Sequence, residues 1–159
     1  MTQYKGIHHL AMITNDMNKT IRFWRDLLGM GLIITSGDGR NRHYFFEISP
    51  NNTIAFFEWP EANNPEMKEQ GTPTDEPMCF DHVAIGVEND RVLNDIKKKL
   101  SDAGYWVSAI IDHGYIHSIY SYDPNNIPIE FCAEVEGIDI RKNPLMKDIN
   151  PCKEAKENH

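Results

Sequence analysis

The sequence lacks the marks of three large classes of protein. Its three cysteines, Cys79, Cys132 and Cys152, are far apart, so neither a disulfide framework nor a Cys-x-x-Cys metal site is indicated. Its longest apolar runs are much shorter than the about 18 residues that a membrane-spanning helix needs. Positive charge is also scarce, because 16 Lys and Arg oppose 24 Asp and Glu and leave a net charge of -8. This balance argues against a nucleic-acid partner.

The N-terminus also lacks the basic and apolar regions of a signal peptide. We therefore expect no membrane insertion and a cytoplasmic location. With 159 residues, of which 40% are hydrophobic, the chain is long enough to bury a sizeable core. We expect a single domain over residues 1–159.

An internal repeat is the strongest pattern in the sequence. Two strand-like stretches, residues 7–13 and 80–87, carry His9 and His82, which are 73 positions apart. Spacings of 74 relate His43 to His117, Pro50 to Pro124, and the pair Asn51-Asn52 to the pair Asn125-Asn126. A nearly constant spacing over this many positions predicts two copies of one structural module.

Each copy predicts the same order of elements, a strand, a helix and three further strands. In module one, residues 5–59, we expect strands at 7–13, 31–35, 43–48 and 53–59, with a helix that begins at Asn15 or Asp16 and ends at Gly29. In module two, residues 79–133, we expect strands at 80–87, 105–111, 115–122 and 127–132, with a helix from Asn89 or Asp90 to Gly104. The predicted fold is α+β, with two tandem βαβββ modules.

The remaining segments are polar. Residues 60–78 contain four prolines and several acids, which predicts a linker rather than a helix. Residues 134–159 are rich in Lys and Glu and predict a polar C-terminal tail, draped on the surface or disordered.

The repeated histidines suggest a site shared by the two modules. If the modules pack about a pseudo-twofold axis, His9 and His82 can face each other, and imidazole is a common metal ligand. Glu130 lies among the apolar residues of the last strand, where a charge is costly unless it is paired or bound to a metal. The simpler alternative is that Glu130 lies at an exposed strand edge. The adjacent His8 is expected to be a surface or packing residue, because its counterpart in the repeat is Asp81.

These segments resemble the vicinal-oxygen-chelate superfamily of glyoxalases, bleomycin-resistance proteins, fosfomycin-resistance enzymes and extradiol dioxygenases. The resemblance covers residues 5–131 and is carried by IHHLA at 7–11, FWRDLLGM at 23–30, FDHVA at 80–84 and DPNNIPIE at 123–130. It implies paired βαβββ modules that form a metal-holding cup around a small-molecule substrate, and it favours a homodimer.

The resemblance implies His9, His82 and Glu130 as metal ligands. Glyoxalase-like members use four protein ligands, whereas extradiol dioxygenases and fosfomycin-resistance enzymes use three. Counting from the two Asn-Asn pairs matches Glu130 to Phe56, so the fourth ligand is absent. Glu58, two residues further on, is the alternative fourth ligand. Three ligands favour Fe(II) or Mn(II); a glyoxalase-like set with Glu58 favours Zn(II), Ni(II) or Co(II).

The resemblance also suggests residues for proton transfer. Extradiol enzymes carry a tyrosine ten residues before the carboxylate ligand, a position that Tyr120 occupies here. They place an acid–base histidine shortly upstream, and both His113 and His117 are candidates. His117 is matched by His43 in module one, so it can equally be a repeated feature of the fold.

Three functions follow as hypotheses. The first is a metal-dependent dioxygenase-like oxidoreductase that acts on a small catecholic substrate. The second is a glyoxalase- or epimerase-type lyase or isomerase, in which Glu58 is a ligand or a base. The third is non-catalytic binding of a small molecule, as in bleomycin-resistance proteins. Glutathione or fosfomycin transfer is less favoured, because an anionic substrate prefers a basic pocket and the chain is acidic.

Overall fold

The computed structural model describes residues 7–38, 41–50, 52–75, 80–140 and 142–144. The elements of module one are β1 (His9–Thr14), α1 (Met17–Ile21), η1 (Arg22–Leu27), β2 (Gly31–Gly37), β3 (Arg42–Ser49) and β4 (Asn52–Glu58). Those of module two are β5 (Val83–Val87), α2 (Asp90–Asp102), β6 (Ile111–Asp112), β7 (Ile116–Tyr122) and β8 (Pro128–Glu134). The α+β fold of two βαβββ modules is confirmed.

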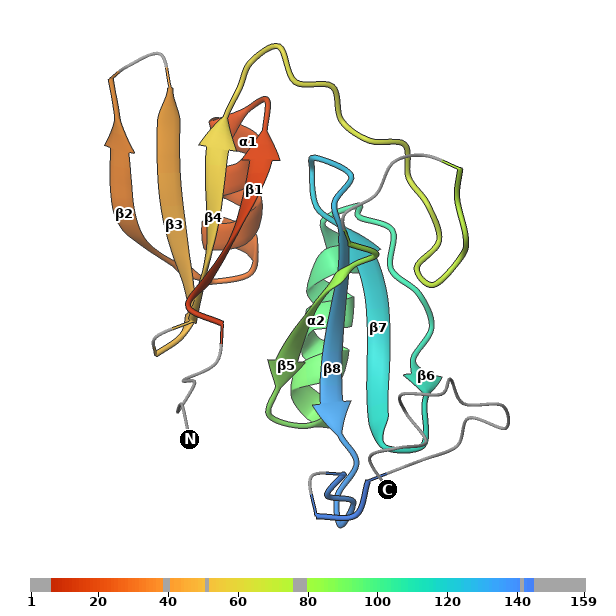
Figure 1. The fold of residues 1–159 in the computed structure, drawn as a ribbon. Helices are drawn as coiled ribbons and strands as arrows, with labels where there is room; N and C mark the ends of the chain where they lie inside the picture. The colour runs from red at the N-terminus through yellow and green to blue at the C-terminus, as the bar shows by residue number, and fades with distance from the viewer. Residues whose placement is uncertain (1–6, 39–40, 51, 76–79, 141, 145–159) are drawn as a thin grey trace, which may run out of the picture.

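The two sheets have the same topology. Their strand orders are β1-β4-β3-β2 and β5-β8-β7-β6. The first and last strands of each module pair in parallel, and the other neighbours pair antiparallel. Figure 1 shows each helix against one face of its own sheet. The opposite face of each sheet is called its open face below.

The helix of module one begins and ends where the sequence predicts. The Asp16 side chain accepts a hydrogen bond from the backbone N–H of Lys19 at 3.0 Å, and Gly29 after the helix has a φ of +81°. The last part, η1, is π-helical rather than α-helical. Phe23 and Trp24, two consecutive residues of this wider turn, are both fully buried.

The strand predicted at 105–111 is wrong for most of its length. Its regular part is only the two residues of β6, preceded by one isolated bridge between Val107 and Ser121. Serine side chains replace the missing ladder: Tyr120 N–H donates to Ser108 Oγ at 3.0 Å, and Ser121 Oγ donates to the Trp106 carbonyl at 2.7 Å. These side-chain bonds satisfy the backbone without a continuous strand. Residues 145–159, most of the predicted tail, lie outside the described residues.

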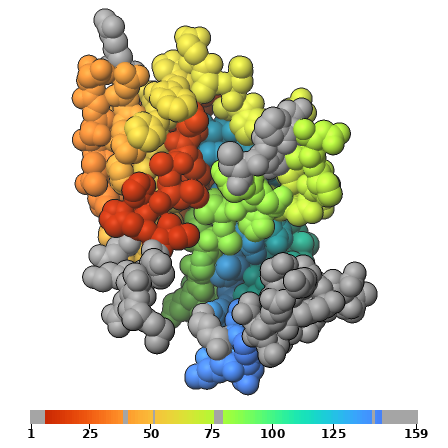
Figure 2. Space-filling model, in the orientation of Figure 1, coloured from red at the N-terminus to blue at the C-terminus, as the bar shows by residue number. Residues whose placement is uncertain are grey.

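The predicted linker packs against both modules. Its Ala62 carbonyl accepts from Asn15 at 3.2 Å, its Pro65 carbonyl accepts from Asn126 at 2.9 Å, and its Lys68 carbonyl accepts from the Tyr122 hydroxyl at 2.6 Å. In Figure 2 the linker (yellow to yellow-green) lies on the surface of the molecule beside both modules. None of the helices in the described ranges is long and apolar enough to cross a membrane.

A buried hydrogen-bond network joins the modules. Four N–H groups, among them Trp24 Nε1 from module one at 3.2 Å, donate to the carboxylate of Asp123. The neighbouring Asn125 accepts from Thr14 Oγ1 at 2.7 Å and donates to Thr20 Oγ1 at 3.2 Å. Burial raises the pKa of Asp123, while the hydrogen bonds to its carboxylate act in the opposite direction. The turn between β7 and β8 thereby attaches module two to module one.

We expect Asn125→Ala to lower the free energy of unfolding by about 2–4 kcal/mol, because it removes three buried hydrogen bonds and leaves polar groups unpaired. Asn52→Ala is the matched control, since Asn52 donates within its own turn, to Ser49 Oγ and to the Pro50 carbonyl, both at 3.3 Å. Urea unfolding of both variants measures the difference. An equal, small effect in the two variants would contradict the role of the network.

An ion pair also connects α2 to the sheet of module two. His117 Nδ1 on β7 lies 2.9 Å from Asp90 Oδ1 at the start of α2. The hydrogen bond to Asp90 is the main reason why the pKa of His117 lies above its usual 6.5. A raised pKa in the folded protein adds stability below the unfolded-state pKa, and this contribution disappears as the pH rises through the folded-state pKa.

His117→Gln should therefore destabilise the protein at pH 5.5 and have little effect at pH 9. Thermal unfolding of both proteins at the two pH values measures this difference. A destabilisation of equal size at both pH values would show that the charge of His117 contributes nothing.

Candidate functional site

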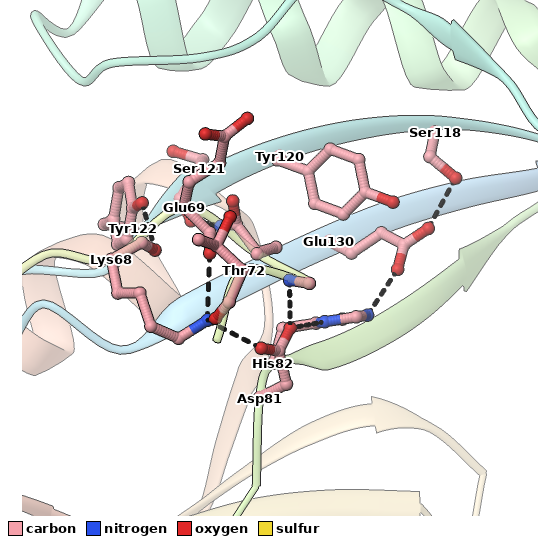
Figure 3. A network of polar contacts seen from close by, with 12 residues as sticks. Lys68, Glu69, Thr72, Asp81, His82, Ser118, Tyr120, Ser121, Tyr122 and Glu130 are labelled. Carbon is pink, nitrogen blue, oxygen red and sulfur yellow. Dashed lines mark hydrogen bonds and ion pairs between the residues drawn. The ribbon is translucent and has the colours of Figure 1, made fainter. Parts of the chain in front are cut away.

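The open face of module two carries a buried carboxylate paired with a histidine. Glu130 on β8 is only 4% exposed, and its Oε2 lies 2.8 Å from His82 Nε2, just before β5. Its Oε1 accepts a hydrogen bond from the hydroxyl of Ser118 on β7. Figure 3 shows these three side chains converging from neighbouring strands. The alternative that Glu130 lies at an exposed strand edge is therefore wrong.

The other nitrogen of His82 also faces a carboxylate. His82 Nδ1 lies 2.7 Å from Asp81 Oδ2, which also accepts from the Gly71 N–H at 2.7 Å. Asp81 Oδ1 accepts from Lys68 Nζ at 2.7 Å. The bond from Lys68, and next the bond from His82, hold the pKa of Asp81 far below its usual value. Asp81 is therefore a permanent anion beside the imidazole.

Tyr120 and His113 lie next to this pair. Tyr120 is directly opposite Glu130 in the β7–β8 ladder, and its ring meets that of His82 edge to face, with 5.9 Å between centroids. Its hydroxyl lies 3.0 Å from His113 Nε2. Burial, and next the charge of Glu130, raise the pKa of Tyr120. The phenol therefore stays protonated at neutral pH.

The structure separates the two candidate acid–base histidines. His113 reaches Tyr120, whereas His117 points to the helix-covered face of the sheet and pairs with Asp90. His43, its match in the sequence, lies on the open face of module one and stacks on Phe57 with 3.7 Å between ring centroids. His43 and His117 are thus not structurally equivalent, and the interpretation of a repeated histidine as a feature of the fold is wrong.

His9 lies on the open face of module one. Its ring contacts Phe45 at 5.5 Å between centroids, as the ring of His82 contacts Tyr120. His9 Nδ1 lies 2.9 Å from His8 Nδ1, so His8 takes the place that Asp81 has beside His82. His9 and His82 therefore have equivalent positions, as the repeat predicts.

The match of Glu130 to Phe56 is wrong by one residue. Ala55 pairs with Ala11 and Phe45, as Glu130 pairs with Ala84 and Tyr120. In module one, Pro50 of the Pro-Asn-Asn motif comes three residues after Glu47, the partner of Thr53. In module two, Pro124 of the same motif comes only two residues after Tyr122, the partner of Pro128. Counting from this motif therefore aligns the last strands of the two modules one residue out of register. Alanine cannot bind a metal, so a fourth ligand is still absent from the matching position.

Glu58 lies on the other face of β4. Its Oε1 accepts from the backbone N–H of Met17 at 2.8 Å, at the start of α1, and its Oε2 pairs with Arg42. Phe56, on the same face, packs on Trp24 at 5.9 Å between centroids. Glu58 is thus directed towards the helix and is remote from the open face that carries His9.

His82 and Glu130 fit two positions of a divalent ion. Two adjacent ligands of an octahedral ion, with bonds of about 2.1 Å, lie about 3 Å apart. The 2.8 Å between Nε2 and Oε2 agrees with that spacing. However, among the described residues no three His, Cys, Asp or Glu side chains are close enough together to hold a metal ion. Within one chain, His9 does not join the other two.

The sequence does not single out Asp81, Lys68 or Ser118 as site residues. Asp81 directly precedes a candidate ligand, and Ser118 is two residues from Tyr120 on the same strand face, so both positions carried a signal. No pattern in the sequence indicates Lys68, because its contact with Asp81 depends on how the linker folds back over module two.

The family model of the Glyoxalase/Bleomycin resistance protein/Dioxygenase superfamily matches residues 6–131. The comparison with curated protein sequences finds no match.

Solved structures agree on the fold. A glyoxylase/bleomycin resistance protein/dioxygenase domain from Frankia sp. EAN1pec is 16% identical, covers 86% of this chain and 96% of its own, and has a TM-score of 0.70. A glyoxalase/dioxygenase from Nostoc punctiforme is 17% identical, with coverages of 83% and 92% and a TM-score of 0.65. The fosfomycin resistance protein FosX from Listeria monocytogenes, solved with Mn(II) and sulfate, is 21% identical, with coverages of 84% and 96% and a TM-score of 0.60.

The family match covers most of the chain and agrees with the repeat, the sheet topology and the equivalent histidines. The chain belongs to the Glyoxalase/Bleomycin resistance protein/Dioxygenase superfamily, the vicinal-oxygen-chelate proteins.

Proposed function

We propose that this chain is a divalent-metal-dependent enzyme, an extradiol-dioxygenase-like oxidoreductase that acts on a small catecholic substrate. The observation that carries the proposal is the His82–Glu130 pair beside Tyr120, with alanine at the matching position of module one. Two histidines and one carboxylate, with open positions for substrate, form the ligand set of non-haem Fe(II) oxygenases.

His82 and Glu130 would hold the ion together with His9 of a second copy. Fe(II) or Mn(II) is the preferred ion for such a set. The Mn(II) present with FosX, a protein of the same fold, supports a divalent ion of this kind. When bound, it would supply the electron transfer between a catecholate and O2 that ring cleavage requires.

A homodimer would complete the site. The open face of module one exposes Ile13 and Phe57 on the same face as His9, and Trp59 stacks on Phe57; these three side chains are 42%, 37% and 48% exposed. An apolar patch of this kind typically marks an interface or a ligand site. A second copy that places its module two against this face would cover the patch and bring His9 to the ion.

Tyr120 and His113 would handle the protons of the substrate. The protonated Tyr120 hydroxyl can donate a hydrogen bond to a substrate oxygen beside Glu130. His113 is exposed and lies 3.0 Å from that hydroxyl, so it can accept a proton and return it to water. His117 has no part in this scheme, because it lies on the other face of β7.

The glyoxalase- or epimerase-type alternative, with Zn(II), Ni(II) or Co(II), depends on Glu58. That carboxylate is engaged by the start of α1 and by Arg42, which argues against its use as a ligand or base. Non-catalytic binding of a small molecule is the outcome to expect if the metal-loaded protein turns over neither class of substrate.

The Fe(II)-loaded protein should consume O2 in the presence of a catechol and open its ring. His113→Gln should lower kcat by about 10²–10⁴, the usual contribution of a general acid–base group. The matched control is His117→Gln at pH 8.5, which changes the same residue type on the other face of β7 and should leave kcat unchanged. An oxygen electrode and the absorbance of the ring-opened product measure both.

Isomerisation of a hemithioacetal without any O2 uptake over a panel of catechols would refute the oxygenase proposal. An equal loss of kcat in the two histidine variants would refute the role of His113.

A further inference from the structure

A continuous series of hydrogen bonds connects the linker between the modules to His82 (Figure 3). Lys68 Nζ and the Gly71 N–H each donate to Asp81 at 2.7 Å, and Asp81 lies 2.7 Å from His82 Nδ1. We propose that Lys68, Gly71 and Asp81 are positioning residues that fix the ring of His82 for metal binding. The linker would then help to form the site by holding Asp81, and would not only connect the two modules. The metal in this inference rests on the proposed function.

Asp81 determines which nitrogen of His82 is free. An ionised carboxylate can only accept hydrogen bonds, so His82 Nδ1 must carry its proton. Nε2 is then the nitrogen left for a metal, which would displace the proton that Nε2 shares with Glu130 Oε2 across 2.8 Å. Carboxylates that orient ligating histidines in this way typically contribute a factor of about 10–100 to metal affinity.

Lys68 in turn determines where Asp81 lies. Its amino group donates to three oxygens: Asp81 Oδ1 at 2.7 Å, the Thr72 carbonyl at 2.7 Å and the Glu69 carbonyl at 2.9 Å. All three of its N–H groups can thus be used, and its side chain is only 15% exposed. The cation therefore closes the loop 68–72 around the carboxylate.

Two further contacts define the shape of this loop. Gly71 has a φ of +73°, which a residue with a side chain adopts only with strain, although the space around it is open. The Tyr122 hydroxyl donates to the Lys68 carbonyl at 2.6 Å and attaches the loop to β7. The loop is thus built on the same sheet that carries Tyr120 and Glu130.

Among its described residues, module one has no such arrangement. There the partner of His9 Nδ1 is His8 Nδ1 at 2.9 Å, an imidazole rather than a carboxylate. Lys68 of the linker binds Asp81 beside His82. Module two therefore presents an oriented pair of ligands, and His9 from the other half completes the set without equal support.

The test combines two measurements on full-length protein. The first is the Mn2+ dissociation constant, from the electron paramagnetic resonance of free Mn2+. The second is the solvent exchange of the His82 Nδ1–H proton, followed by NMR in metal-free, 15N-histidine-labelled protein. We expect Asp81→Asn to weaken Mn2+ binding by about 10–100-fold. We expect Lys68→Met and Gly71→Ala to act in the same direction, and all three to speed the proton exchange.

Lys98→Met is the matched control. It removes the same charge from an exposed lysine that pairs with Asp102 on α2, and it should change neither measurement. If Asp81→Asn and Lys68→Met fold and match the wild type in both measurements, the inference is overturned. If the wild type binds no Mn2+ but the proton exchange responds, the metal-dependent function fails while the positioning of His82 stands.

Discussion

The relation between the two modules depends on the buried hydrogen bonds that the β7–β8 turn makes with module one. Asp123 and Asn125 pair with Trp24, Thr14 and Thr20, so polar groups that would be costly to bury alone satisfy one another. The attachment uses the helix of module one and the end of β1, which leaves the open faces of both sheets free. In this arrangement His9 does not join His82 and Glu130, and this constraint leads us to a site shared by two copies.

The duplicated modules have diverged at equivalent positions. Where module two has Glu130, Tyr120, Ser118 and Asp81, module one has Ala55, Phe45, His43 and His8. One half therefore carries the buried charge, its hydrogen-bond partners and the support of the linker. The other half offers the aromatic rings of Phe45 and Phe57 together with three imidazoles, those of His8, His9 and His43. This difference fits the proposed function, in which one half would hold the ion and the other would cover the substrate.

The sequence predicts the fold well, because the repeat fixes the order of elements and identifies His9 and His82 as equivalent. It fails where a result depends on register or on tertiary contacts. Counting from the turn motif matches Phe56 to Glu130, but this motif is shifted by one residue relative to the strands, and the sequence does not assign His117 to a face. The link from Lys68 to His82 could not be predicted, because nothing in residues 60–78 indicates that the linker folds back onto module two.

The most direct test of a shared site uses two variants, His9→Ala and His82→Ala, each of which removes one ligand from every site. Co-expression with two different affinity tags allows the mixed dimer to be isolated. In a shared site, one of its two sites has both histidines intact, so we expect about one Mn2+ per mixed dimer, against about two for the wild type. A mixed species that binds no Mn2+, beside a wild type that does, would contradict the account.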